Sequence, residues 1–350
     1  MATPTYPSRR FFACGVTQGA AWGTALPVGA LDELVVTSDG NPALKQNYSS
    51  SDAINRVMPI DGDLGAFEAI DFSPEFAGKI GLQYEMGAMG GPIAALFGTA
   101  PAPADLTGAY KHTWQWADEV TDFFTFVTER PNDIWEIPSC VPMKLSLKVG
   151  DGKLQGSITL RGNMLTNASV VNTATEVDAM TAADDANFVK FQHGACRMNA
   201  QGGAGLGAGD NLIISDLQLD FERLMDAQIS MGATYLSQPK EQSWKITVKI
   251  KLPYVTAANT YHDIFTTMAA QKMSLVFTGG IIGATAIPYE VAFYFPRLKL
   301  TSPPDIKLED IITGGLEFVA EEAITSLPTG MLYYRPYMTV TNLLNAQYVT

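Results

Sequence analysis

The chain has 350 residues, of which 47% are hydrophobic, and its formal net charge is −13. These values predict a folded protein with a substantial core and disfavour nucleic-acid binding through phosphates, which requires clustered lysine and arginine. Charged residues make up only 17% of the chain, below the share of about 25% in typical soluble proteins. This low share indicates that neighbouring subunits cover part of the surface.

Targeting and cysteine signals are weak. The sequence contains no apolar run of about eighteen residues and no signal peptide, so we expect no membrane span and synthesis in the cytoplasm. The three cysteines, Cys14, Cys140 and Cys196, are odd in number and lack paired spacing. We therefore expect plain thiols rather than a disulfide framework or a zinc site.

The N-terminal quarter mixes irregular segments with short strands. Residues 1–30 read as an extended arm held by a partner, 31–37 as a strand, and 38–62 as an interaction loop. Residues 65–86 are expected to form two strands separated by a turn at Ser73 and Pro74. A short helix follows, since Pro92 suits a first turn and Gly98 suits a C-terminal cap.

The clearest pattern is a β-hairpin over residues 141–162. Strands are also predicted at 109–116, 122–129 and 133–137, and in the hairpin Lys144, Ser146 and Lys148 lie opposite an apolar row. Gly150 and Gly152 suit a tight turn. The apolar face must be covered by other elements, and its residues are candidates for contact with another subunit. They are Met143, Leu145, Leu147, Leu154, Ile158 and Leu160.

Residues 163–187 break the alternation and mark a boundary between two predicted domains, 31–175 and 176–350. The second half is expected to hold an amphipathic helix with Tyr261, Ile264, Phe265 and Met268 on one face. Both halves follow the order strands, helix, strands, which suggests an internal duplication. Strands of the second half are predicted at 188–199, 212–223, 244–252, 273–278, 286–300, 314–322 and 336–344.

No pattern indicates catalysis or a cofactor. The histidines His112, His193 and His262 lack neighbours at metal-ligand spacing. The glycine-rich stretch 201–209 precedes a strand rather than a helix, so it is interpreted as a hairpin loop and not a phosphate cradle. Aromatic residues at 114–126 could stack on a sugar or base, but on strands such residues usually belong to the core.

A row of acidic residues is a candidate functional surface. Asp216, Asp220 and Glu222 occupy one face of the predicted strand 212–223, whose other face carries Ile213, Leu217, Leu219 and Phe221. The row could bind calcium, although a solvated face is the simpler interpretation. Repeated around a ring, such a face would line a lumen with a negative field.

Several segments together resemble the tail tube proteins of long-tailed, siphovirus-like bacteriophages. The resemblance covers residues 65–345: a YKHTWQW strand, an FTFVTER strand, the hairpin, NLIISDLQLDFERL, and a terminal sheet beginning with residues 287–300. The matching positions are Tyr110, His112, Thr113, Phe124, Thr125, Cys140, Val141, Leu145, Ser146, Leu147, Leu154 and Gly162.

This resemblance implies a mainly β tail-tube fold, a β-sandwich or open barrel flanked by a helix and here duplicated in tandem. It implies a non-enzymatic virion protein, made in the host cytoplasm, whose rings stack into a conduit for double-stranded DNA. Expected partners are further copies of the chain, the tape-measure protein and other tail proteins. Three chains per pseudo-hexameric ring fit a duplication, and six chains are the alternative.

Two other functions remain open at this stage. A tube subunit of a contractile or secretion apparatus would share the fold class. A carbohydrate-binding β-sandwich adhesin would use the region of Trp114 and Trp116.

Overall fold

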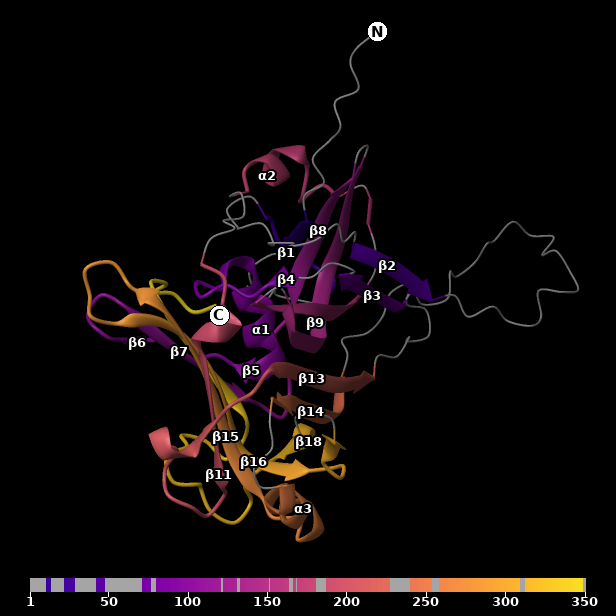
Figure 1. The fold of residues 1–350 in the computed structure, drawn as a ribbon. Coiled ribbons are helices and arrows are strands. Elements are labelled where there is room, and N and C mark those ends of the chain that lie inside the picture. Colours follow the sequence, from indigo (N-terminus) through magenta and orange to yellow (C-terminus); the bar gives the residue numbers. More distant parts are fainter. Residues whose placement is uncertain are drawn as a thin grey trace, which may run out of the picture.

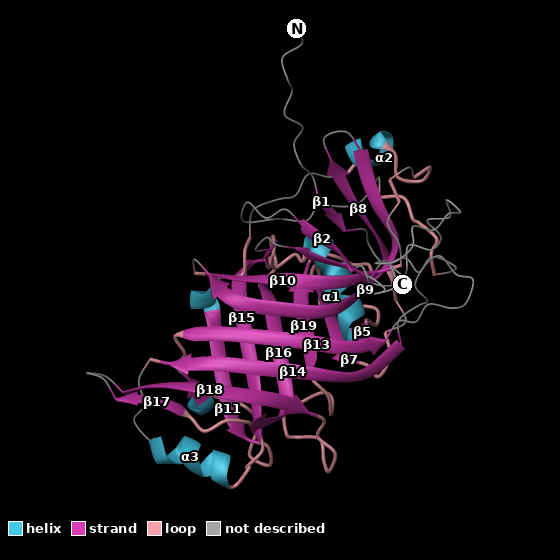
Figure 2. Ribbon diagram, turned by 90° about the vertical axis from the view of Figure 1, so that its right-hand side faces the viewer, coloured by secondary structure: helices cyan, strands magenta, loops and turns pink. Residues whose placement is uncertain are grey.

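The computed structural model describes residues 11–13, 22–28, 42–47, 71–76, 80–120, 122–130, 133–150, 152–163, 166–167, 169–180, 187–226, 240–253, 258–308 and 312–348. Their strands form one antiparallel sheet that folds into two layers (Figure 1). In Figure 2 the strands of the first layer run across those of the second at a steep angle. This mainly β architecture confirms the predicted fold class, and the predicted strand 31–37 lies outside the described residues.

The first layer follows the spatial order β2, β3, β10, β9, β13, β14, β18 and β17. The predicted hairpin supplies its centre, and Gly152 in the turn has a φ of +72°, as the turn requires. The bounds are Pro42–Asn47 (β2), Asp71–Phe76 (β3), Asp133–Gly150 (β9), Lys153–Gly162 (β10), Asp216–Asp226 (β13), Lys240–Leu252 (β14), Asp305–Leu308 (β17) and Ile312–Glu321 (β18).

The second layer follows the order β11, β15, β16, β19 and β7. β16 turns the corner between the layers, because its first part pairs with β19 and its last part, from Arg297 to Leu300, pairs with β18. The bounds are Tyr110–Trp116 (β7), Gly194–Ala200 (β11), Gln271–Ile281 (β15), Pro288–Leu300 (β16) and Tyr337–Asn342 (β19).

Shorter elements decorate these layers. β1 pairs with β8, β4 with β10, β5 and β6 with β7, and β12 with β11. The strands are Phe11–Ala13 (β1), Ile80–Gly81 (β4), Gly98–Thr99 (β5), Ala104–Asp105 (β6), Phe124–Arg130 (β8) and Asn211–Leu212 (β12). The helices are Gly90–Phe97 (α1), Ala174–Asp178 (α2) and Ala258–Thr266 (α3), with 3₁₀ turns at Gly87–Met89, Phe191–His193 and Ala208–Asp210.

One main hydrophobic cluster fills the space between the layers and draws on both predicted domains. Every residue of α1 is buried, and Gly98 ends the helix in the left-handed conformation predicted for it. Phe221 of β13 lies at the centre, with its ring 5.5 Å from that of Phe97 and 5.9 Å from that of Phe293. Strands of the two halves also pair directly, β9 with β13 and β7 with β19. A tandem duplication of domains remains a prediction.

Parts of the predicted arm pack on their own chain. The backbone N–H groups of Gly23 and Leu26 donate to the hydroxyls of Ser139 and Thr125, and Val28 is fully buried. β1 extends the sheet beside β8. An additional role of the arm in holding a partner remains a prediction.

Several predicted boundaries in the first half were wrong. Ser73 and Pro74 lie within β3, which a proline can join where no ladder bond needs its missing N–H. The predicted loop 38–62 contains β2, because pairing with β3 outweighs its weak strand propensity. The predicted strand 133–137 continues into the hairpin as β9, and the shift in pairing beside Pro142 accommodates the proline.

Other boundaries were wrong in the second half. The predicted strand 188–199 begins only at Gly194, after a 3₁₀ turn. β13 begins at Asp216, and Ile213 is 56% exposed instead of lying in the apolar row. α3 ends at Thr266, so Met268 is 71% exposed instead of packing on the helix's apolar face.

The shared core predicts that both halves unfold together. Phe221→Ala should lower the free energy of unfolding by about 3–5 kcal/mol, because its ring contacts aromatic residues of both halves. Calorimetry should show one cooperative transition for the parent chain and the variant. Two separate transitions, of which only one shifts, would show that the halves are independent.

Candidate functional site

The first layer carries an open polar face, which we define by the outward residues around β13. In β13 the side chains of Leu217, Leu219 and Phe221 are buried in the core, whereas the alternate residues point outward. The polar face consists of Lys144, Ser146 and Lys148 on β9, Asp216, Gln218, Asp220 and Glu222 on β13, and Lys245, Thr247, Lys249 and Lys251 on β14.

The strand register places the acidic row between two lysine rows. Glu222 is paired with Lys144 on one side and with Lys245 on the other. Asp216 is paired with Lys251, and Gln218 lies between Lys148 and Lys249. Side chains in directly opposite positions have Cβ atoms about 5 Å apart, so the opposite charges are immediate neighbours. The predicted row of carboxylates exists, but it is flanked by compensating charge.

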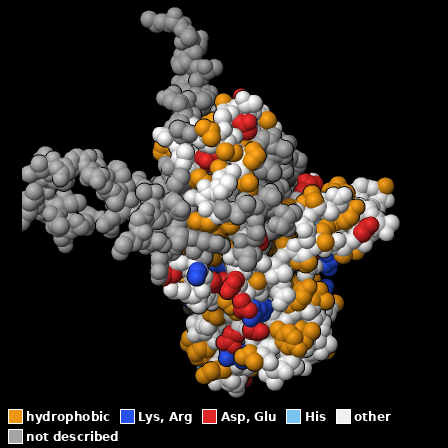
Figure 3. Space-filling model, turned by 180° about the vertical axis from the view of Figure 1, so that it is seen from behind, with side chains coloured by type: hydrophobic (Ala, Val, Ile, Leu, Met, Phe, Trp, Pro, Cys, Tyr) orange, Lys and Arg blue, Asp and Glu red, His pale blue; other side chains and the backbone are white. Residues whose placement is uncertain are grey.

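Hydrogen bonds and ion pairs hold this arrangement. Asp220 accepts hydrogen bonds from the Ser146 hydroxyl and, at 2.7 Å, from the side-chain amide of Gln218. Lys249 forms an ion pair of 3.3 Å with Glu317 of β18. Farther along, Glu321 pairs with Arg297 at 3.0 Å and Lys299 at 3.2 Å. Viewed from behind, acidic and basic side chains also intermingle in one band between hydrophobic patches (Figure 3).

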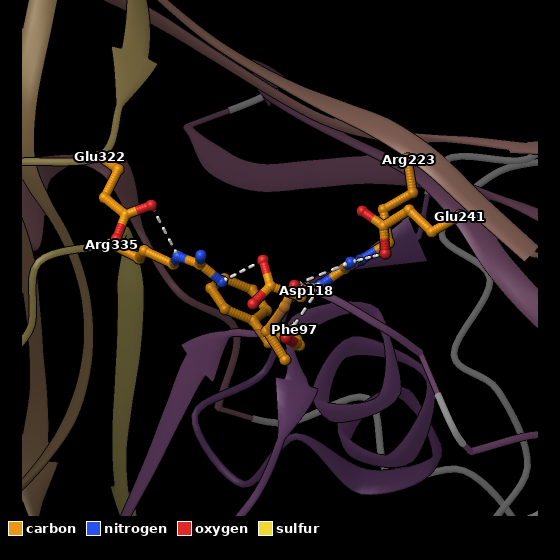
Figure 4. A network of polar contacts seen from close by, with 7 residues as sticks. Phe97, Asp118, Arg223, Glu241, Glu322 and Arg335 are labelled. Atoms are coloured by element: carbon orange, nitrogen blue, oxygen red, sulfur yellow. Dashed lines mark hydrogen bonds and ion pairs between the residues drawn. The ribbon is translucent and has the colours of Figure 1, made fainter.

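A buried ion pair anchors α1 beneath this face (Figure 4). The Arg223 guanidinium donates to the carbonyl oxygens of Leu96 and Phe97 at 2.6 and 3.0 Å, at the negative end of the α1 dipole. It also forms an ion pair with Glu241, and the two side chains are 0% and 5% exposed. Its carbon atom Cζ lies 4.0 Å from the ring centre of Trp116, in a cation–π contact.

Burial lowers the pKa of Arg223 to about 10, while the charge of Glu241 opposes that change. Burial raises the pKa of the Glu241 carboxyl, and Arg223 opposes that shift in turn. The guanidinium therefore keeps its charge at neutral pH. Beside this pair, Arg335 bonds Asp118 at 2.7 Å and Glu322 at 3.1 Å, which ties the segment after β7 to the end of β18.

A comparison with protein families places this architecture. The family model described as "Phage tail tube protein" matches residues 15–321 of the chain. The chain belongs to the phage tail tube protein family. It is therefore a structural component of the virion tail. A search of curated proteins finds no match to the chain.

In this tail tube protein, the apolar residues of the β9–β10 hairpin lie in the subunit's own core. Leu145, Leu147, Leu154, Ile158 and Leu160 are buried there, and Met143 is half-buried at its margin. This row is covered within the chain, so a contact between the hairpin and another subunit would involve its polar residues or its turn. That contact remains a prediction.

The tryptophan, cysteine and His112 candidates of this tail tube protein that the structure describes are buried. Trp114 and Trp116 are buried, as the core interpretation of the aromatic residues predicted, and they do not form an exposed sugar platform. His112 is buried and its Nε2 lies 3.0 Å from the carbonyl oxygen of Leu344. Cys140 and Cys196 are free buried thiols, whereas Cys14 lies outside the described residues.

Among the residues with described structure, no group of three or more His, Cys, Asp or Glu residues could hold a metal ion. No helix in the same part of the chain is long and apolar enough to cross a bilayer.

Sequence reasoning missed Arg223, although its signal was present. Arg223 follows Leu217, Leu219 and Phe221 at the same two-residue spacing, so the alternation already assigned it to the buried face. Its partner Glu241 could not be predicted, because the pairing depends on how β13 and β14 align.

The Arg223–Glu241 pair gives a stability prediction. Arg223→Met should lower the free energy of unfolding by about 3–5 kcal/mol, because it leaves the Glu241 carboxylate buried without its partner. The double variant Arg223→Met/Glu241→Gln should recover part of that loss in denaturant unfolding. As a control, Lys249→Met breaks an exposed pair and should cost less than about 1 kcal/mol. If Arg223→Met and Lys249→Met lowered the free energy of unfolding equally, the buried ion pair would not have the stabilising role assigned to it.

Proposed function

We propose that this tail tube protein assembles into rings that stack into a hollow tube, through which double-stranded DNA passes during ejection. Membership of the family supports self-assembly with other tail proteins. The observation that carries the proposal further is the two-layer sandwich with one open polar sheet face. Such a face can form part of the inner wall of a tube while the apolar core stays within each subunit.

The two outer faces of the sandwich differ in a way that supports this orientation. In the second layer, outward residues such as Lys272 and Thr339 are buried at 0% and 1% exposure. Lys272 donates to the carbonyl oxygens of Gly203 and Thr329, which belong to loops lying over that layer. On the first layer, Asp216, Lys148 and Lys245 are exposed. The proposed lumen surface is therefore the polar face, including the candidate residues Asp216, Asp220 and Glu222.

The number of chains per ring follows from how many tube folds each chain contains. A duplicated chain would favour three chains in a pseudo-hexameric ring. Strands of both halves, however, contribute to one main core and one continuous sheet. This arrangement supports one tube fold per chain and six chains per ring. The tape-measure protein inside the tube and other tail proteins at its ends are the further proposed partners.

Electron microscopy of the purified protein tests assembly directly. We expect stacked rings or hollow tubes, and averaged end views should show six repeats rather than three. Protein that stays monomeric at high concentration, with no rings or tubes, would contradict the proposed function. A ring with three repeats would support the tube function but would indicate three chains, each with two tube domains.

Site-specific labelling tests which face lines the lumen. In a Cys14→Ser background, Asp216→Cys adds an exposed thiol to the polar face, while Cys140 and Cys196 stay buried. A small electron-dense maleimide label should appear on the inner wall of the averaged tube. The unlabelled Cys14→Ser protein is the matched control. Label density on the outer wall would rule out the proposed orientation.

A further inference from the structure

The polar face carries more positive than negative charge, although the chain as a whole is acidic. The outward residues of its three strands include six lysines (Lys144, Lys148, Lys240, Lys245, Lys249 and Lys251) and four carboxylates (Asp216, Asp220, Glu222 and Asp226). The whole chain has a net charge of −13. All of the net negative charge therefore lies elsewhere, and a uniformly negative wall does not describe this surface.

From this arrangement we propose that the polar face is a DNA-contacting surface whose lysines are masked by the acidic row of β13. The inference rests on the proposed function, because it concerns the wall along which DNA would pass. Neighbouring strands are about 4.8 Å apart, which is less than the Debye length of about 8 Å at physiological salt. Carboxylates between lysine rows thus cancel the attraction of the lysines for phosphates before salt screens it.

The contacts of β13 show why the mask stays in place. The Asp220 carboxylate is held by Ser146 and Gln218, which orient it on the face between the lysine rows. Glu222 has a lysine on each side, so its single carboxylate weakens the positive field of both Lys144 and Lys245. Lys249 is further paired with Glu317. The lysines remain available for brief phosphate contacts, while the carboxylates prevent tight binding and allow DNA to slide.

Removing the mask should convert this face into a DNA-binding surface. The unmasked variant carries Asp216→Asn, Asp220→Asn and Glu222→Gln. The matched control, Glu119→Gln, Asp178→Asn and Asp263→Asn, removes three exposed carboxylates elsewhere and changes the net charge equally. Binding of unassembled subunits to a labelled DNA duplex of random sequence is measured by fluorescence anisotropy across a salt series.

We expect the unmasked variant to bind at least about tenfold more tightly than the parent chain and the control at low salt, with affinity falling steeply as salt rises. Adding Lys144→Gln, Lys245→Gln and Lys249→Gln should abolish the gain. Equal affinity of the unmasked and control variants would overturn the inference, as would tight binding by the parent chain. Circular dichroism checks that each variant is folded. If the unmasked variant does not fold, the single variants Glu222→Gln and Glu119→Gln are compared instead, and equal DNA affinity of these two would overturn the inference.

Microscopy separates this inference from the proposed function. If the parent chain forms tubes but the unmasked variant gains no DNA affinity, the masking inference fails and the proposed tube function stands. Gained affinity in a protein that never forms rings or tubes would overturn the tube assignment and leave the masked surface intact.

Discussion

The position of α1 depends on one buried cation. Arg223 reaches from β13 to the carbonyl oxygens at the end of α1 and is neutralised by Glu241 of β14. A charge in this location is costly unless its hydrogen bonds are satisfied, and here the carbonyl oxygens, the carboxylate and the Trp116 ring share it. The same residue thus joins the helix of the first half to strands of the second.

The core determines what the surface can do. Because most apolar side chains of β9, β10, β13 and β14 are buried in the core, their polar side chains are left together on one open face. The order of the strands then sets the charge pattern, with an acidic strand between two lysine-rich ones. For a tail tube protein, whose proposed cargo is a polyanion, such a pattern offers contact without strong attraction. A row of carboxylates considered alone suggests repulsion, which is a different mechanism.

Much of the local structure was predictable. The two-residue alternation identified the hairpin and β14, strands were also predicted over β7 and β16, and the glycine at the end of α1 marked where the helix stops. Errors fell where distant pairing overrides local propensity. Pro74 was expected to mark a turn, yet it lies in β3 because its neighbours form the ladder around it. β2 has a polar sequence and is a strand through its pairing with β3.

The sequence by itself determined the family resemblance, the β class and the inward row of the hairpin and of β13 from Leu217 to Arg223, since these depend on short spacings along the chain. Only the tertiary structure decided which strands are neighbours. Lys144 and Glu222 are far apart in the sequence, and so are Arg223 and the carbonyl oxygen of Leu96 that it binds. Salt screens exposed charges beyond a Debye length of about 8 Å. The charge of the polar face and the burial of Arg223 therefore depend on a pairing that no local pattern encodes.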